Sequence, residues 1–305
     1  MQTPWGDFPV CDAHVHFFSP AFFALLAAQS GHPLDVEEIG RTLDCRVPAT
    51  CEDLAAAWKQ ELDEYSVAKA ALIASVPGDE DSVAAAVARY PDRFWGFFMA
   101  NPAAADGVAS VQRALAGGLL QGVCLFPAMH RYSIADPRVR PVFEAAAAYP
   151  GTVVFVHCGV LTVGVRRKLG LPSLFDMRYS NPIDLHVVAT EFPGVNFVIP
   201  HFGAGYFREA LMLCDLCPNV YLDTSSSNSW LRYQTEKLDL KDVFQKALEV
   251  AGPQRLLFGS DSSFFPRGWH AQIFQTQVQA LCGIEIAADH AGMILGGNLE
   301  RLLAR

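Results

Sequence analysis

A recurring pattern of hydrophobic and polar segments divides the chain into alternating units. An Ala-rich, helix-like segment ends at a proline, one to three small or polar residues follow, and then comes an apolar run rich in β-branched and aromatic residues. The five instances are RYPDRFWGFFMAN, AYPGTVVFVHCG, EFPGVNFVIPHFG, LCPNVYLDTSS and AGPQRLLFGSDSS. Helices tend to stop before proline, and strands buried on both faces read as continuous apolar runs. Each instance therefore predicts a helix followed by a buried strand.

Three further apolar runs, PVCDAHVHF, AKAALIASV and QGVCLFPAMH, bring the predicted strands to eight. Eight strands, each followed by a helix, predict a single α/β domain over residues 1–305 with a (β/α)8 TIM-barrel fold. We expect residues 19–49 to form an insertion after the first strand, over the barrel mouth, because such connections usually take a few residues. An open doubly wound sheet is the competing fold, but it normally has a glycine-rich loop where HVHFFSP stands here.

Histidine and aspartate residues gather at the predicted carboxyl ends of the strands. His14 and His16 end the first strand, and His157, His201 and Asp261 end the fifth, sixth and eighth. The active site of a TIM barrel lies at this end of the strands. Imidazole nitrogen and carboxylate oxygen are the ligands that zinc and similar divalent ions favour. Convergence of these side chains from four strands would therefore create a metal site.

Asp12 precedes the two histidines of the first strand in the stretch VCDAHVHFF. Because strand residues alternate between faces, Asp12, His14 and His16 are expected to share the face that points into the barrel. Unpaired polar groups would be costly there, and a metal would satisfy them. Asp12 lies deeper, so we expect it to hydrogen bond to a metal ligand rather than to bind the metal. An ordinary satisfied buried carboxylate is the alternative.

Composition narrows the class of protein. The chain is 51% hydrophobic and 18% charged, which is typical of a globular domain with a large core. Its net charge of −9 and the absence of long basic clusters argue against nucleic acid as a partner. The sequence shows no secretory signal and no apolar run long enough for a membrane span. Eight scattered cysteines fit a reducing compartment, so we expect a cytoplasmic protein that acts on a small molecule.

The ordered motifs DAHVH, VFVHCG, FVIPHFG, NVYLDTS and LLFGSDSS, with ILGGNLERLL at the end, resemble the amidohydrolase-related family of metal-dependent barrels. Within that family the chain is similar to the branch that contains aminocarboxymuconate-semialdehyde decarboxylase and the resorcylate decarboxylases. The similarity covers roughly residues 10–303. It implies an enzyme with one divalent metal ion, zinc in the first place and manganese or iron as alternatives, and it suggests a homodimer.

The resemblance also implies roles for individual residues. His14, His16, His157 and Asp261 would bind the metal, and His201 would stand beside the metal-bound water as general acid and base. Asp261 would in addition accept or return a proton. Many relatives have a lysine where this chain has Cys124 in GVCLFP, so the bridging lysine of binuclear members has no obvious source. We therefore expect a mononuclear site.

Candidate substrate-binding residues lie in predicted loops near the barrel mouth. Arginine pairs bidentately with carboxylates, and several arginines follow the strand ends. The aromatic stretches FFSPAFFALL and SSFFPRGW suggest an apolar mouth that would suit an aromatic or unsaturated acid. The candidates are His130, Arg46, Arg166, Arg167, Arg178, Arg267 and Trp269.

Three functions from different classes are compatible with these residues. The first is a hydrolase in which metal-activated water cleaves a C–N bond or a lactone or ester C–O bond of a small organic acid. The second is a metal-dependent, non-oxidative decarboxylase of an aromatic or unsaturated acid. The third is a non-catalytic binding barrel, against which the full set of ligand-type residues argues. The ligands alone do not separate the first two functions, because one constellation can serve both.

Overall fold

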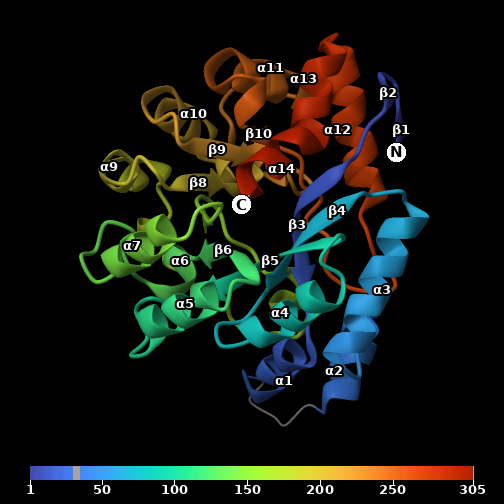
Figure 1. The fold of residues 1–305 in the computed structure, drawn as a ribbon, viewed down its shortest axis with the longest axis vertical. Helices are drawn as coiled ribbons and strands as arrows, with labels where there is room; N and C mark the ends of the chain where they lie inside the picture. Colours follow the sequence, from blue (N-terminus) through green and yellow to red (C-terminus); the bar gives the residue numbers. More distant parts are fainter. Residues whose placement is uncertain (30–34, 305) are drawn as a thin grey trace.

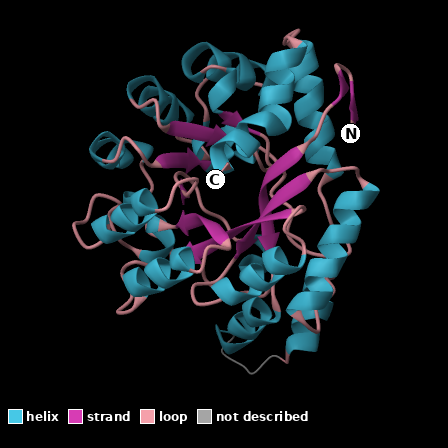
Figure 2. Cartoon of the chain, viewed as in Figure 1, coloured by secondary structure: helices cyan, strands magenta, loops and turns pink. Residues whose placement is uncertain are grey.

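Eight parallel strands form one sheet in their order along the chain, surrounded by helices (Figure 1, Figure 2). The computed structural model describes residues 1–29 and 35–304. The eight predicted strands are confirmed; they are β3 (Cys11–Phe17), β4 (Lys69–Ala74), β5 (Phe94–Ala100), β6 (Leu120–Leu125), β7 (Val153–Val156), β8 (Asn196–Ile199), β9 (Val220–Asp223) and β10 (Leu256–Leu257). A short hairpin, which the pattern did not predict, precedes them as β1 (Gln2–Thr3) and β2 (Gly6–Asp7).

Backbone hydrogen bonds between the first and last strands close the sheet into a barrel. Ala13 N donates to Phe258 O at 2.8 Å, and Asp261 N donates to His14 O at 3.0 Å. His16 N donates in turn to the carbonyl of the residue after Asp261, at 2.7 Å. The predicted TIM barrel is thereby confirmed, and its closure joins the two strands that carry His14, His16 and Asp261.

Helices connect successive strands and pack around the barrel (Figure 2). They are α1 (Pro20–Gln29), α2 (Val36–Leu43), α3 (Cys51–Glu64), α4 (Glu80–Arg89), α5 (Gly107–Ala116), α6 (Pro127–His130), α7 (Arg140–Ala148), α8 (Gly164–Lys168), α9 (His186–Glu191), α10 (Phe207–Leu216), α11 (Leu240–Ala251), α12 (Ala271–Gly283), α13 (Ala288–Gly292) and α14 (Asn298–Leu303). None of the helices in the described part of the chain is long and apolar enough to cross a membrane.

Helices α1 and α2 occupy the stretch between β3 and α3 where the insertion is predicted. Residues 30–34 of that stretch lie outside the described residues. Phe22, Phe23 and Leu26 of α1 pack with Ile39 and Leu43 of α2 in a small hydrophobic cluster, which also contains Val76 and Leu171. The two helices are therefore held beside the strand ends by apolar contacts to each other and to the loops after β4 and α8.

The hydrophobic core has two layers, one inside the barrel and one between strands and helices. Ala13, Phe97 and Phe155 belong to the inner layer, whereas Val15 and Phe17 belong to the outer one. The inner layer ends at α14, whose three buried leucines pack against it. The last helix therefore covers the barrel at the end opposite the carboxyl ends of the strands.

A register shift in β3 changes which face its polar residues occupy. The pairing of β3 with β4 is irregular between Asp12 and Val15, as in a β-bulge. Asp12 accepts a hydrogen bond from Trp269 Nε1 at 2.8 Å, and Trp269 belongs to the outer layer. His14 instead packs against Phe155 of the inner layer. The expectation that Asp12 shares a face with both histidines is therefore wrong, because the bulge interrupts the strict alternation.

Candidate functional site

Three side chains from the first and last strands converge at the carboxyl ends of the barrel strands. His14 Nε2 lies 3.3 Å from His16 Nε2, and Asp261 Oδ1 lies 3.3 Å from His16 Nε2 and 3.7 Å from His14 Nε2. Ligands at about 2.1 Å from a tetrahedral ion are about 3.4 Å apart. The spacing of these three atoms therefore fits one divalent metal ion, and the three residues form a group suited to holding one.

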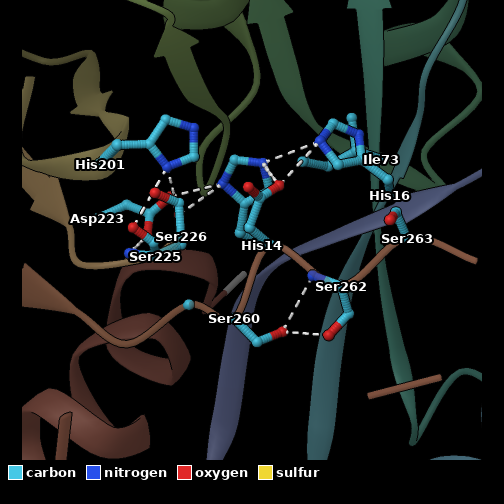
Figure 3. A network of polar contacts seen from close by, with 12 residues as sticks. His14, His16, Ile73, His201, Asp223, Ser225, Ser226, Ser260, Ser262 and Ser263 are labelled. Atoms are coloured by element: carbon cyan, nitrogen blue, oxygen red, sulfur yellow. Dashed lines mark hydrogen bonds and ion pairs between the residues drawn. The ribbon is translucent and has the colours of Figure 1, made fainter. Parts of the chain in front are cut away.

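Hydrogen bonds fix the ring nitrogen that each histidine of β3 presents to this group. His14 Nδ1 lies 2.7 Å from Asp223 Oδ2, and a carboxylate accepts, so Nδ1 carries the proton. His16 Nδ1 lies 2.8 Å from Ser75 Oγ, whose own proton goes to a backbone carbonyl. Both Nε2 atoms therefore keep a lone pair for a metal. Figure 3 shows His14 between His201 and His16 in this network.

Ser225 connects His201 to the same carboxylate. Its hydroxyl lies 2.9 Å from Asp223 Oδ2, to which it donates, and 2.8 Å from His201 Nδ1, from which it accepts. His201 therefore holds its proton on Nδ1 and leaves Nε2 free. The His201 ring stacks on the His14 ring with centroids 5.0 Å apart.

Strained backbone positions hold the polar side chains at the strand ends. His201 has φ 56° and Asp261 has φ 58°, in the left-handed region that non-glycine residues rarely adopt. Such conformations cost about 1–3 kcal/mol and persist only where the surroundings enforce them. The hydrogen bond from Asp261 N to His14 O is one such restraint. The chain tolerates the strain at the two positions that face the candidate metal group.

His157 lies near this group but is not part of it. Its ring centroid is 5.4 Å from that of His201 and 5.4 Å from that of Phe126, on which it stacks. Its Nδ1 is buried and has no hydrogen-bond partner among the described residues. Burial, together with the charges of His201 and His14, lowers its pKa well below the usual range. A neutral imidazole with an unsatisfied nitrogen is the form that can bind a metal.

Burial and mutual charge shift the other pKa values of the site. Burial would raise the pKa of Asp261, but the neighbouring imidazoles of His16, His14 and His201 outweigh it, and its pKa is lowered. Burial lowers the pKa of His201. Burial also opposes charge on His14, but the charge of Asp223 and its hydrogen bond to the ring raise the pKa overall. Asp261 is therefore an anion among imidazoles, as a metal ligand would need to be.

A cavity of about 900 Å³ opens above these residues and is walled largely by aromatic and aliphatic side chains. Phe18, which follows β3, and Phe22 of α1 line it, with ring centroids 3.8 Å apart. Of the predicted substrate residues, His130, Arg166 and Arg267 line the cavity. Burial lowers the pKa of His130 to about 4. The predicted apolar mouth is therefore present, with basic side chains set into it.

The other predicted substrate residues do not line this cavity. Arg46 is exposed and stacks on Phe265 at 5.7 Å, and Arg167 is also exposed. Arg178 forms a surface ion pair with Asp176. Spacing along the chain did not reveal that these arginines point away from the mouth.

Trp269 is a further correction, because it is 2% exposed and lies behind the barrel wall. It donates to Asp12 Oδ2, while Asp12 Oδ1 accepts from His14 N and Ser260 N. Asp12 thus contacts the backbone of a candidate ligand and not its imidazole. The carboxylate that orients His14 is Asp223, the last residue of β9. Ser75 and Ser225 were missed, since serine is too common at strand ends to stand out.

A model of the amidohydrolase family matches residues 11–305, which is almost the whole chain. The chain belongs to the amidohydrolase family. This amidohydrolase is 33% identical over 87 residues to Protein fluG of Emericella nidulans, a match that covers 28% of this chain and 10% of that protein. The match therefore spans about a tenth of the length of that curated relative.

Solved structures with the same fold include a decarboxylase and a probable hydrolase. One is the D314N mutant of 5-carboxyvanillate decarboxylase from Novosphingobium aromaticivorans, with bound manganese and 3-methoxy-4-hydroxy-5-nitrobenzoic acid; its TM-score is 0.66 at 14% identity, covering 100% of both chains. The other is a probable 2-pyrone-4,6-dicarboxylic acid hydrolase from Acinetobacter baumannii with bound citric acid; its TM-score is 0.60 at 16% identity, covering 97% of this chain and 100% of that one. These two neighbours share the fold of this chain, and one is named as a decarboxylase and the other as a probable hydrolase. The family match, and not this likeness, makes the chain a member of the amidohydrolase superfamily of enzymes.

Proposed function

We propose that this amidohydrolase binds one divalent metal ion and hydrolyses a C–N bond, or a lactone or ester C–O bond, of a small organic acid. The observation that carries the proposal is the metal-like spacing of His14 Nε2, His16 Nε2 and Asp261 Oδ1 at the floor of the cavity. His157, with its unsatisfied buried Nδ1, is the fourth ligand in this proposal. When bound, such an ion lowers the pKa of a water ligand and polarises a substrate oxygen.

The side chains around the ligands have separate tasks in the proposed reaction. His201 keeps its proton on Nδ1 through Ser225, so its Nε2 can take a proton from water and return it to the leaving group. Asp261 faces both histidines of β3 with its Oδ1 atom. Its second carboxylate oxygen can therefore hold a proton during the reaction. The aromatic and aliphatic side chains of the cavity place an apolar surface beside the reacting groups.

A decarboxylase is the second candidate function. Arg267 lines the cavity beside aromatic Phe264, which would suit an aromatic acid, and the manganese-containing neighbour with a bound nitrobenzoic acid is itself a decarboxylase. In this reaction His201 Nε2 or Asp261 would first take up a proton from solvent and then deliver it to the carbon that loses carbon dioxide.

Zinc is the metal we propose first, because its preferred ligands match the histidine-rich set, with manganese and iron as alternatives.

Metal analysis and product analysis test the proposal together. Purified protein is expected to contain about one divalent metal ion per chain, as measured by mass spectrometry of the released metal. Acid release from a panel of lactones, esters and amides, without carbon dioxide, would support the hydrolase. Carbon dioxide release from hydroxybenzoates and unsaturated diacids would support the decarboxylase instead. Protein free of metal, or a His157→Ala variant with full activity, contradicts the proposed site.

We further propose a cytoplasmic enzyme that acts on a small molecule and forms a homodimer. All eight cysteines are free, which supports a reducing compartment. A positively charged face for nucleic acid is not expected at a net charge of −9. Sedimentation analysis of the purified protein tests the homodimer, and a monomer at micromolar concentration would contradict it.

A further inference from the structure

Helix α12, all of which the structure describes, buries a single polar side chain, that of Gln277. Gln277 is 1% exposed. The other buried residues of the helix are apolar; they are Ile273, Phe274, Val278, Ala280 and Leu281. A buried amide costs free energy unless it is hydrogen bonded. The amide of Gln277 therefore needs specific partners inside the protein.

Three hydrogen bonds join Gln277 to the carboxyl ends of β9 and β10. Thr224 Oγ1 donates to Gln277 Oε1 at 2.6 Å, and Gln277 Nε2 donates to Thr224 O at 2.9 Å. Gln277 Nε2 also donates to Gly259 O at 3.0 Å. Both N–H groups of the amide and its oxygen are therefore in use. The amide bridges the two strands just beyond their last backbone pair, Asp223 with Leu257.

The bridged segments carry the two carboxylates that lie at the two nitrogens of His14. Thr224 follows Asp223, whose Oδ2 lies 2.7 Å from His14 Nδ1. Gly259 lies just before Asp261, whose Oδ1 lies 3.7 Å from His14 Nε2. The segments approach closely, because a Cβ on Gly259 would lie 2.6 Å from Asp223 Oδ1. A change in the separation of β9 and β10 would therefore move one carboxylate relative to the other across the imidazole ring.

Buried asparagines hold the amino ends of the same two strands in a similar way. Asn298 Nδ2 donates to Pro253 O at 2.7 Å and to Leu256 O at 2.8 Å, at the start of β10. Asn219 Nδ2, just before β9, donates to three backbone carbonyls at 2.9–3.1 Å. Side-chain amides thus hold both ends of β9 and β10, and Gln277 does so at the end that carries the candidate metal group.

We propose that Gln277 is a positioning residue for the candidate metal group. Its amide fixes the separation of β9 and β10, and with it the places of Asp223 and Asp261 around the ring of His14. Gln277 is not among the described residues that line the cavity, so it acts through these two carboxylates. The inference rests on the proposed function, because it takes His14 and Asp261 to bind a metal ion.

Metal affinity in Gln277→Met, measured by competition with a chelator, tests this inference. Methionine is as long as glutamine but makes none of the three hydrogen bonds. We expect the affinity for zinc to fall at least about tenfold, because residues that orient metal ligands typically have effects of that size. The visible absorption spectrum of the cobalt-loaded protein is expected to change as well, since it reports the geometry of the ligands.

Asn298→Leu is the matched control, because it removes buried amide hydrogen bonds at the opposite end of β10. It is expected to lower the denaturation midpoint in urea as Gln277→Met does, because both changes leave buried carbonyls without a donor. Its zinc affinity is expected to stay within about twofold of the original, with an unchanged cobalt spectrum.

Thr224→Val is a milder second variant, which removes only the hydrogen bond to Gln277 Oε1. It is expected to lower zinc affinity about threefold to tenfold, and its result decides if Gln277→Met does not fold. Unchanged affinity in Thr224→Val and in every folded Gln277 variant overturns the inference. An equal loss of affinity in Asn298→Leu also overturns it, because general destabilisation would then be the cause.

The metal content of the unaltered protein is measured first, which separates the two proposals. A protein without metal contradicts the proposed function. A protein that binds metal with an affinity independent of Gln277 contradicts only the positioning role.

Discussion

His14 and His16 of β3, and His201 in the loop after β8, each contact a fixed partner through Nδ1. The partners are Asp223 for His14, Ser75 for His16 and Ser225 for His201. Because a ring has only two nitrogens, every Nδ1 partner decides that Nε2 is the atom presented to the cavity. The tautomers of the site are therefore set by residues outside the candidate metal group.

Asp223→Asn tests this control of the tautomer. Asp223 Oδ1 accepts a hydrogen bond from Ser225 N at 2.7 Å, and the side-chain oxygen of an asparagine can do the same. The NH₂ group of that asparagine would then point toward His14 Nδ1. His14 would then protonate Nε2 and lose the lone pair that a metal needs. We expect metal affinity to fall about 10–100-fold, as measured by competition with a chelator.

Asp215→Asn is the control for this change, because Asp215 is exposed at the end of α10 and has no contact with the site. It is expected to leave metal affinity unchanged. Unaltered metal affinity in Asp223→Asn would show that Asp223 does not set the form of His14.

At the scale of elements, the loop after β7 and the loop after β8 are in direct backbone contact. Val160 N donates to Ala204 O at 2.8 Å, which ties the loop after β7 to the loop after β8. Gly159 has φ 78°, and a Cβ there would overlap the carbonyl oxygens of Gly203 and Ala204. A glycine at this position thus lets the loops that follow His157 and precede α10 approach closely.

Gly159→Ala is expected to lower the free energy of unfolding by about 2–4 kcal/mol, because the added methyl group meets backbone that has little freedom to move. Activity is expected to fall as well, since the loop after His201 would be displaced. Urea denaturation at equilibrium measures the first effect. Gly164→Ala is the matched control, because nothing lies within 4 Å of a Cβ at that position. An unchanged denaturation midpoint in Gly159→Ala would contradict the close approach.

At the scale of the whole molecule, the metal group joins the first strand to the last. His14 and His16 lie on β3, whereas Asp261 follows β10, and these two strands close the barrel. A metal bound here would cross-link the two ends of the sheet. Binding to the folded chain alone stabilises it by about 2.7 kcal/mol at a metal concentration of 100 times the dissociation constant.

Removal of the metal is therefore expected to lower the melting temperature, and its return to restore it. Thermal denaturation with and without a chelator, followed by added zinc, measures the change. Asp261→Asn weakens the ligand set, so this variant is expected to melt at the same temperature with and without chelator. A chelator effect of equal size in this variant and in the unaltered protein would place the stabilising metal elsewhere.

The amino-acid sequence by itself determined the class of fold and the family. Apolar runs that end in histidine or aspartate mark strands whose carboxyl ends carry the chemistry, and five of these residues lie around one cavity. The local pattern is sufficient to predict these strands, because a parallel strand that is buried on both faces requires a continuous apolar run.

Tertiary structure alone decided which side chains contact one another. A bulge in β3 moved Asp12 to the outer face, and Asp223 became the partner of His14 across the barrel. Only the folded chain distinguished Arg267 and Lys168, which line the cavity, from Arg167, which does not. The physical reason is that direction and contact depend on register, loop geometry and packing between elements far apart in sequence, and a spacing along the chain contains none of these.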